Sequence, residues 1–108
     1  MNTQEFLASP YYRNAWVTEP HMSIYLRKAT RVIANKTCKT FDIASLEVEE
    51  EYRGKGLFTA WLAGLTLDKF DYIYVENVLK EAFKSKLLRS GFTELCEETS
   101  PCFYRKVI

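Results

Sequence analysis

The stretch from Leu46 to Phe58 constrains the fold more than any other part of the sequence. It starts in an apolar run rich in strand formers, continues through three glutamates and Arg53-Gly54-Lys55-Gly56, and opens a segment with apolar residues at every third or fourth position. This order predicts a strand, a glycine-containing turn and an amphipathic helix over 57–67. A second strand-forming run, Tyr72–Val75, follows, so we expect it to pair with the first strand in parallel.

A predicted antiparallel hairpin precedes this unit. β-Branched and aromatic residues dominate 23–34 and 40–48, and the turn-like segment 35–37 separates them. Strict alternation along the second of these strands predicts two largely apolar faces, which places the strand in the centre of the sheet. One face is expected to carry Phe41, Ile43 and Ser45, and the other Ala44, Leu46 and Val48.

The C-terminal part predicts a second helix and a closing strand. The helix is expected over 79–89, with Ala82, Phe83 and Leu87 facing inward and Gly91 ending it. Residues 101–107 alternate in the manner of a strand. The predicted fold is therefore α/β (α+β), a mixed central sheet flanked by helices.

We expect one domain over residues 1–108, because no repeat, low-complexity tract or linker divides the chain. Residues 1–22 are the least regular part, since prolines interrupt a mixture of aromatic and polar residues. They predict an abbreviated N-terminal cover, a short helix followed by irregular chain.

Composition excludes several classes of function. The 15 basic and 14 acidic side chains leave a formal net charge of +1, too little for a long contact with a nucleic-acid backbone, so a nucleic-acid partner is not expected. The longest apolar stretch is too short to span a bilayer, and residues 1–10 lack the basic start and apolar run of a signal peptide. We therefore expect a cytoplasmic protein with no membrane partner.

The cysteines and the histidine give no metal pattern. Cys38, Cys96, Cys102 and the single His21 match no spacing of zinc ligands, so no metal site is expected. We interpret the thiols as small buried apolar groups in a reducing compartment, with Cys102 reactive only if it faces a pocket.

The glycine-containing turn is the best candidate for a ligand site. Backbone N–H groups at a helix start lack partners in the helix and carry a partial positive charge, so a pyrophosphate can accept several hydrogen bonds there. Gly54 and Gly56 allow close approach and positive φ, while Arg53 and Lys55 add two cations. The alternative interpretation is a solvated turn without a ligand. The glycine motifs for dinucleotides and for nucleoside triphosphates are both absent.

The segment Arg53–Phe58 resembles the signature Arg/Gln-x-x-Gly-x-Gly/Ala of the GCN5-related N-acetyltransferase family, with Phe58 replacing the final small residue. The resemblance runs from about Ser23 onward, and compact bacteriophage members are especially similar over 74–79 and 87–92. It implies an acyltransferase fold in which two parallel strands splay apart and the pantetheine arm of acetyl-coenzyme A inserts between them. Acetyl-coenzyme A is thus the expected acyl donor.

The resemblance also implies which residues contact the donor. The central strand would supply main-chain hydrogen bonds to the arm, the turn would bind the diphosphate, and the end of the next strand would add a polar contact. These positions are Leu46, Glu47, Val48, Arg53, Gly54, Lys55, Gly56, Leu57, Phe58 and Asn77.

An amine acceptor must lose a proton, because a lysine amine has an ordinary pKa near ~10.4. Glu76 follows an apolar strand and is the first candidate for the base. Asp42 and Glu47 on the central strand are the reserve candidates, although Asp42 would also suit an ion pair with Arg27 or Arg31.

The resemblance leaves the general acid without its usual residue. Relatives place a tyrosine four residues before the Gly-Phe pair, where this chain has Leu87. Protonation of the departing thiolate would then come from Tyr104 or from water.

The acceptor side is shorter than in the family. Only about 20 residues precede the hairpin, so we expect either a partner subunit, as in a homodimer, or an acceptor that needs only a shallow cleft, such as a protein lysine or chain terminus. A small amine or a modified nucleobase is a further candidate. The interpretation from a different class is a non-catalytic binding module that blocks a host protein.

Overall fold

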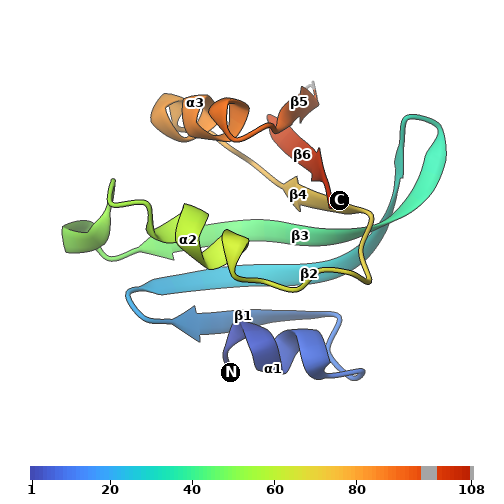
Figure 1. Cartoon of the computed structure of the whole chain (residues 1–108), viewed down its shortest axis with the longest axis horizontal. Coiled ribbons are helices and arrows are strands. Elements are labelled where there is room, and N and C mark those ends of the chain that lie inside the picture. Colours follow the sequence, from blue (N-terminus) through green and yellow to red (C-terminus); the bar gives the residue numbers. More distant parts are fainter. Residues whose placement is uncertain (96–99, 108) are drawn as a thin grey trace.

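The computed structural model describes residues 1–95 and 100–107 and contains one mixed sheet with three α-helices (Figure 1). The strand order is β1-β2-β3-β4-β6-β5, and only β3 and β4 run parallel. The predicted fold class is confirmed. The elements are α1 (Thr3–Ala8), β1 (Asn14–Glu19), β2 (Met22–Ile33), β3 (Lys36–Val48), the short 3-10 helix η1 (Glu50–Tyr52), α2 (Leu57–Ala63), β4 (Tyr72–Val75), α3 (Glu81–Arg89), β5 (Thr93–Leu95) and β6 (Cys102–Lys106).

The hairpin of β2 and β3 is confirmed, but its turn is shorter than predicted. Ala34 and Asn35 alone form the turn, with φ of 52° and 65°. Positive φ at both central residues is the geometry of a two-residue hairpin whose twist matches its strands.

A β-bulge in β3 overturns the predicted assignment of faces. Leu26 lies opposite Ile43 while Tyr25 lies opposite Ser45, so Ala44 is an extra residue in β3. One extra residue shifts the alternation by one place. Leu46 therefore lies on the same face as Ile43, not on the opposite face.

One face of the sheet is an apolar core beneath the three helices. Phe6 of α1, Phe58 and Leu62 of α2, and Leu87 of α3 belong to one buried cluster with apolar side chains from five strands. Burying such a side chain contributes about 1.5–3 kcal/mol. This cluster fixes α2 and α3 against the sheet, next to the end of β3.

The opposite face has a different composition. Its buried cluster, Ile33, Cys38, Tyr74 and Cys102, contains no residue from any described helix. Asp42 of β3 is also fully buried on this face. Charged side chains from β2 cover it, as described below.

The N-terminal part contains more regular structure than the sequence indicated. The short helix is confirmed as α1, but the irregular cover is wrong, because Asn14–Glu19 forms the edge strand β1. A tight turn at Pro20 and His21, where His21 has φ of 66°, joins β1 directly to β2.

Several predicted boundaries also shift. α2 ends at Ala63 because Gly64 caps it, its N–H bonding to the carbonyl of Ala60, and α3 starts at Glu81 instead of Leu79. Ala82 is exposed rather than inward-facing. β5 was not predicted, and Cys96 lies outside the described residues. None of the helices in the described ranges is long and apolar enough to cross a bilayer.

Candidate functional site

A groove of about 1190 Å³ opens where β3 and β4 separate. The two strands pair only as far as Ile43 and Val75. Beyond that point Asn77, with φ of 55°, marks the turn of the chain away from β3. The segment Ala44–Val48 therefore forms one wall of the groove, with β2 along one side and no described strand along the side that faced β4. Its unpaired main-chain groups can accept an extended ligand in the way a sheet edge accepts another strand.

The glycine-containing turn closes one end of the groove. Gly54 and Gly56 have φ of 73° and 77°, and a Cβ at either position would meet nothing within 4 Å. The backbone N–H groups of Gly54, Lys55 and Gly56 donate to no described residue. Successive free N–H groups in a glycine turn form a concave site for an anion. The turn thus has the donors that the sequence predicted.

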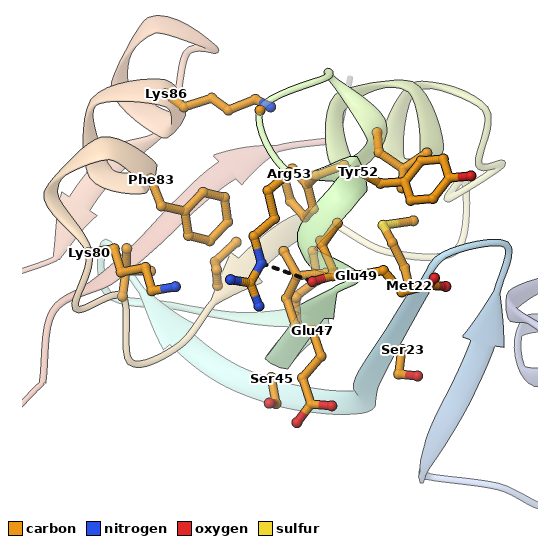
Figure 2. A pocket seen from close by; sticks show the side chains of 18 of the residues that line it. Met22, Ser23, Ser45, Glu47, Glu49, Tyr52, Arg53, Lys80, Phe83 and Lys86 are labelled. Atoms are coloured by element: carbon orange, nitrogen blue, oxygen red, sulfur yellow. Dashed lines mark hydrogen bonds between the residues drawn. The ribbon is translucent and has the colours of Figure 1, made fainter.

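The two predicted cations of the turn behave differently. Arg53 reaches into the groove, where its Nε donates to the carbonyl oxygen of Val48 at 3.0 Å (Figure 2). Lys55 is exposed and does not line the groove.

Helix α3 supplies further cations that the sequence reasoning missed. Lys80, which caps the helix, Lys86 and Arg89 line the groove, and Figure 2 shows the first two beside Arg53. Residues three apart share a helix face, so the spacing of Lys80, Phe83 and Lys86 was the signal available in the sequence. The groove therefore has one strongly basic end.

Phe58, the residue that departs from the family signature, does not block the turn. Its ring is buried against Phe83, with centroids 5.3 Å apart in an edge-to-face arrangement, and against Trp61 at 5.8 Å. The ring belongs to the apolar floor beneath the groove. Leu57 and Phe58 both line it.

The rim formed by the β1–β2 turn holds the only histidine. The His21 ring stacks on Tyr52 with centroids 3.5 Å apart, and its Nδ1 lies 3.2 Å from Glu49 Oε2. These contacts tie the turn to the segment that follows β3. This pairing could not be predicted from the sequence, because 28 residues separate His21 from Glu49.

Two of the three candidate carboxylates share the same pair of arginines. Arg31 donates to Asp42 Oδ2 at 2.6 Å and to Glu76 Oε1 at 2.6 Å, while Arg27 donates to the same Oε1. Asp42 also accepts a hydrogen bond from Thr40 Oγ1 at 2.6 Å. The pairing of Asp42 with arginine, the alternative to catalysis, is confirmed.

Arg31 is the centre of this charged network. Partial burial alone would lower the pKa of Arg31, but the hydrogen bond and charge of Asp42, aided by Tyr74 and Glu76, raise it. Its guanidinium also lies 3.9 Å from the centroid of the Tyr74 ring. The network covers the sheet face that no described helix covers.

The structure separates the predicted catalytic residues. Glu76 and Glu47 line the groove together with Asn77, whereas Asp42 and Tyr104 do not. Tyr104 instead packs edge-to-face on Tyr72, with centroids 5.7 Å apart. Catalytic roles for Glu76, Asp42 and Tyr104 stay predictions. No group of three residues in the described ranges has metal-binding geometry.

Comparison with known proteins supports the fold. No family profile and no curated protein sequence matches the chain. Among solved structures, a tyrosine-to-phenylalanine mutant of the toxin AtaT, bound to the C-terminus of the antitoxin AtaR and acetyl-CoA, matches with a TM-score of 0.55 and 18% identity. The same mutant bound to AtaR alone gives 0.57 and 18%, and a KacTA–DNA complex gives 0.54 and 19%.

Each match covers 79% of this chain but only 57% of the other. The chain thus spans a little over half the length of the toxin chains it matches. At this identity the likeness establishes the fold, which is that of GCN5-related acyltransferases.

Proposed function

We propose that the groove binds an acyl-coenzyme A and that the chain transfers the acyl group to an amine. The observation that carries this proposal is the groove between the separated strands β3 and β4, with one wall whose main chain is open on the side that faced β4 and a basic, N–H-rich end. Coenzyme A matches both parts, because it joins an extended amide-containing arm to several phosphates. The AtaT structure with acetyl-CoA supports the choice of donor.

The arm would lie along Leu46, Glu47 and Val48. Its amides can pair with their main-chain N–H and C=O groups as an added strand would. Arg53 occupies the Val48 carbonyl in the structure, so a bound arm would compete with Arg53 for that oxygen. The displaced guanidinium would be free for phosphate.

The phosphates would bind at the basic end. The N–H groups of the glycine turn, which donate to no described residue, suit the diphosphate. Arg53, Lys80, Lys86 and Arg89 line the same groove and have no ion-pair partner among the described residues. Arginine and lysine bind phosphate through charge-assisted hydrogen bonds.

The thioester would then lie toward Ala44 and the end of β4, beside Glu76 and Asn77. The acceptor amine attacks the carbonyl carbon, and a main-chain N–H of β3 beside the thioester would stabilise the oxyanion. Holding the pantetheine arm between the two strands would also orient the thioester toward the amine. Such orientation lowers the barrier of the transfer reaction.

The test is calorimetry with acetyl-coenzyme A on wild type, Gly56→Ala and Gly91→Ala. Both glycines have positive φ, 77° and 88°, so both variants carry similar backbone strain of about 1–2 kcal/mol. Only the Gly56 methyl group would enter the anion site. We expect Gly56→Ala to weaken binding at least about tenfold, which is ~1.4 kcal/mol, and Gly91→Ala to bind as wild type does.

Two results would reject the proposal in different ways. If wild type shows no acetyl-coenzyme A binding, the groove has another ligand. If acetyl-coenzyme A binds but its thioester is never consumed, the chain is a binding module with an acyltransferase fold.

A further inference from the structure

We propose that Arg53 makes the groove selective against donors without a phosphate, because its side chain competes with the pantetheine arm for the carbonyl oxygen of Val48. The inference rests on the proposed function and adds the specificity of its donor site. It starts from one contact, the hydrogen bond that Arg53 Nε donates to that oxygen at 3.0 Å (Figure 2). The chain thus occupies with its own side chain an acceptor that the arm would use.

The carbonyl of Val48 points to the open side of β3. Met22 lies opposite Val48, and the N–H of Glu49 donates to the carbonyl of His21 at 3.0 Å. In an antiparallel pair this pattern leaves the main-chain groups of Val48 pointing away from β2. Those of Leu46, two residues earlier, point the same way. Leu46 and Val48 are therefore the residues whose main chain an inserted arm would meet, and one of their two carbonyls is already in use.

The two ends of this contact differ in how firmly they are held. Val48 precedes Glu49, whose N–H bonds to the carbonyl of His21 and whose Oε2 lies 3.2 Å from the His21 ring. The side chain of Arg53 is exposed and forms no ion pair with any described residue. When an arm binds, we therefore expect the carbonyl to stay in place and the guanidinium to move.

The cost of moving Arg53 depends on the ligand. Its hydrogen bond to the carbonyl is charge-assisted, so an arm that takes the carbonyl and offers nothing in return binds more weakly. Arg53 directly precedes Gly54, in the turn where the phosphates would bind. A phosphate at the end of the arm would give the freed guanidinium an anionic acceptor, which is stronger than a carbonyl. Selectivity of this kind comes from a penalty on the wrong ligand as well as from contacts to the right one.

The other cations of the groove cannot impose this penalty. Lys80, Lys86 and Arg89 line the groove, but within residues 1–95 and 100–107 their side chains donate to no carbonyl of its wall. They favour a ligand with phosphates and do not oppose a ligand without them. Removing the side chain of Arg53 should therefore change the affinities for the two kinds of donor in opposite directions.

The experiment measures dissociation constants by NMR titration of ¹⁵N-labelled protein with S-acetylpantetheine, S-acetyl-4′-phosphopantetheine and acetyl-coenzyme A. The first ligand has the arm alone, and the other two add phosphate to the same arm. Wild type is compared with Arg53→Met and Arg13→Met, since methionine keeps an unbranched stem but has neither the charge nor the donors. Arg13 is an exposed arginine outside the groove lining, so its variant matches the change of charge.

We expect Arg53→Met to bind S-acetylpantetheine about threefold more tightly than wild type, or ~0.7 kcal/mol, which is near the lower end for one hydrogen bond because the contact is exposed. The two ligands with phosphate should bind about tenfold more weakly, because they lose a charged partner. Arg13→Met should bind all three ligands as wild type does. In wild type, the Arg53 Nε–H signal should shift when S-acetylpantetheine binds, because that proton loses its acceptor.

The sign of the first change decides the inference. It is overturned if Arg53→Met binds S-acetylpantetheine no more tightly than wild type, since Arg53 would then only contact phosphate or support the turn. It is also overturned if Arg13→Met reproduces the changes, or if S-acetylpantetheine binds without shifting the Arg53 Nε–H signal. If wild type binds none of the three ligands, the proposed function itself is rejected.

Discussion

The two faces of β3 are stabilised in different ways. On one face Phe41 and Ile43 are buried under three helices in an apolar cluster. On the other face Thr40 and Asp42 are equally buried, but no described helix covers them. Arg31 pairs with Asp42, which in turn accepts a hydrogen bond from Thr40. One strand thus depends on dispersion and the hydrophobic effect on one side and on charge pairing on the other.

This difference shows how a short chain can cover a central strand with few elements. A tight turn joins β1 to β2, so no helix from that connection is available for the second face. Arginine stems are long enough to cover apolar surface while their charged heads reach water. The guanidinium of Arg31 also covers the buried face directly, since it lies over the Tyr74 ring.

The largest expected effect tests the helix-covered face. Phe41→Ala should reduce the free energy of unfolding by about 3–5 kcal/mol, because it leaves a cavity in a closely packed core. Urea denaturation followed by circular dichroism would measure it. Should this variant fail to fold, Phe41→Leu should still fold with a loss below about 1.5 kcal/mol. Val32→Ala, at a side chain 71% exposed, is the control. If Phe41→Ala and Val32→Ala lose the same small amount, the comparison between the faces fails.

An intermediate effect is expected on the charged face. Asp42→Asn should cost about 2 kcal/mol, the range for hydrogen bonds to charged groups, because Arg31 loses one of its two anionic partners. Water reaches both arginines, which limits the loss. The same urea measurement applies, with Glu51→Gln as an exposed carboxylate control. A neutral or stabilising Asp42→Asn would show that this face does not depend on charge pairing.

The smallest effect is expected at the margin of the face without helices. Trp16 is 50% exposed and packs on Tyr25 with ring centroids 5.4 Å apart. Trp16→Ala should therefore cost only about 0.5–1.5 kcal/mol, the value of one aromatic pair. Thermal unfolding would measure the change. A loss as large as that of Phe41→Ala would mean that the edge of this face is packed as closely as the core beneath the helices.

Most elements were predictable because their signals are local. The hairpin, the strand–turn–helix unit around Gly56 and the helix before Gly91 all follow from periodicity and glycine placement. β1 was missed because its core-facing side presents only two apolar residues, Ala15 and Val17, which is too short a pattern to recognise. The bulge at Ala44 was missed because strict alternation leaves no place for an extra residue.

The site was predictable only in part, for a similar reason. The glycine turn is contiguous, so its free N–H groups followed from Arg53-Gly54-Lys55-Gly56. The contacts that determine which carboxylates are paired with arginine are not local, since Glu76 and Arg31 are 45 residues apart in the sequence. Nothing in the sequence around Glu76 distinguishes a free carboxylate from a paired one.

The N–H groups of Gly54, Lys55 and Gly56, which have no acceptor within residues 1–95 and 100–107, also make the turn a natural reporter of ligand binding. Amide protons without an acceptor exchange rapidly with deuterium, and a bound anion would slow all three together. Deuterium exchange measured in the presence of different metabolites would therefore detect a ligand bound at this turn. The ligand would need no label, and its chemical class need not be known beforehand.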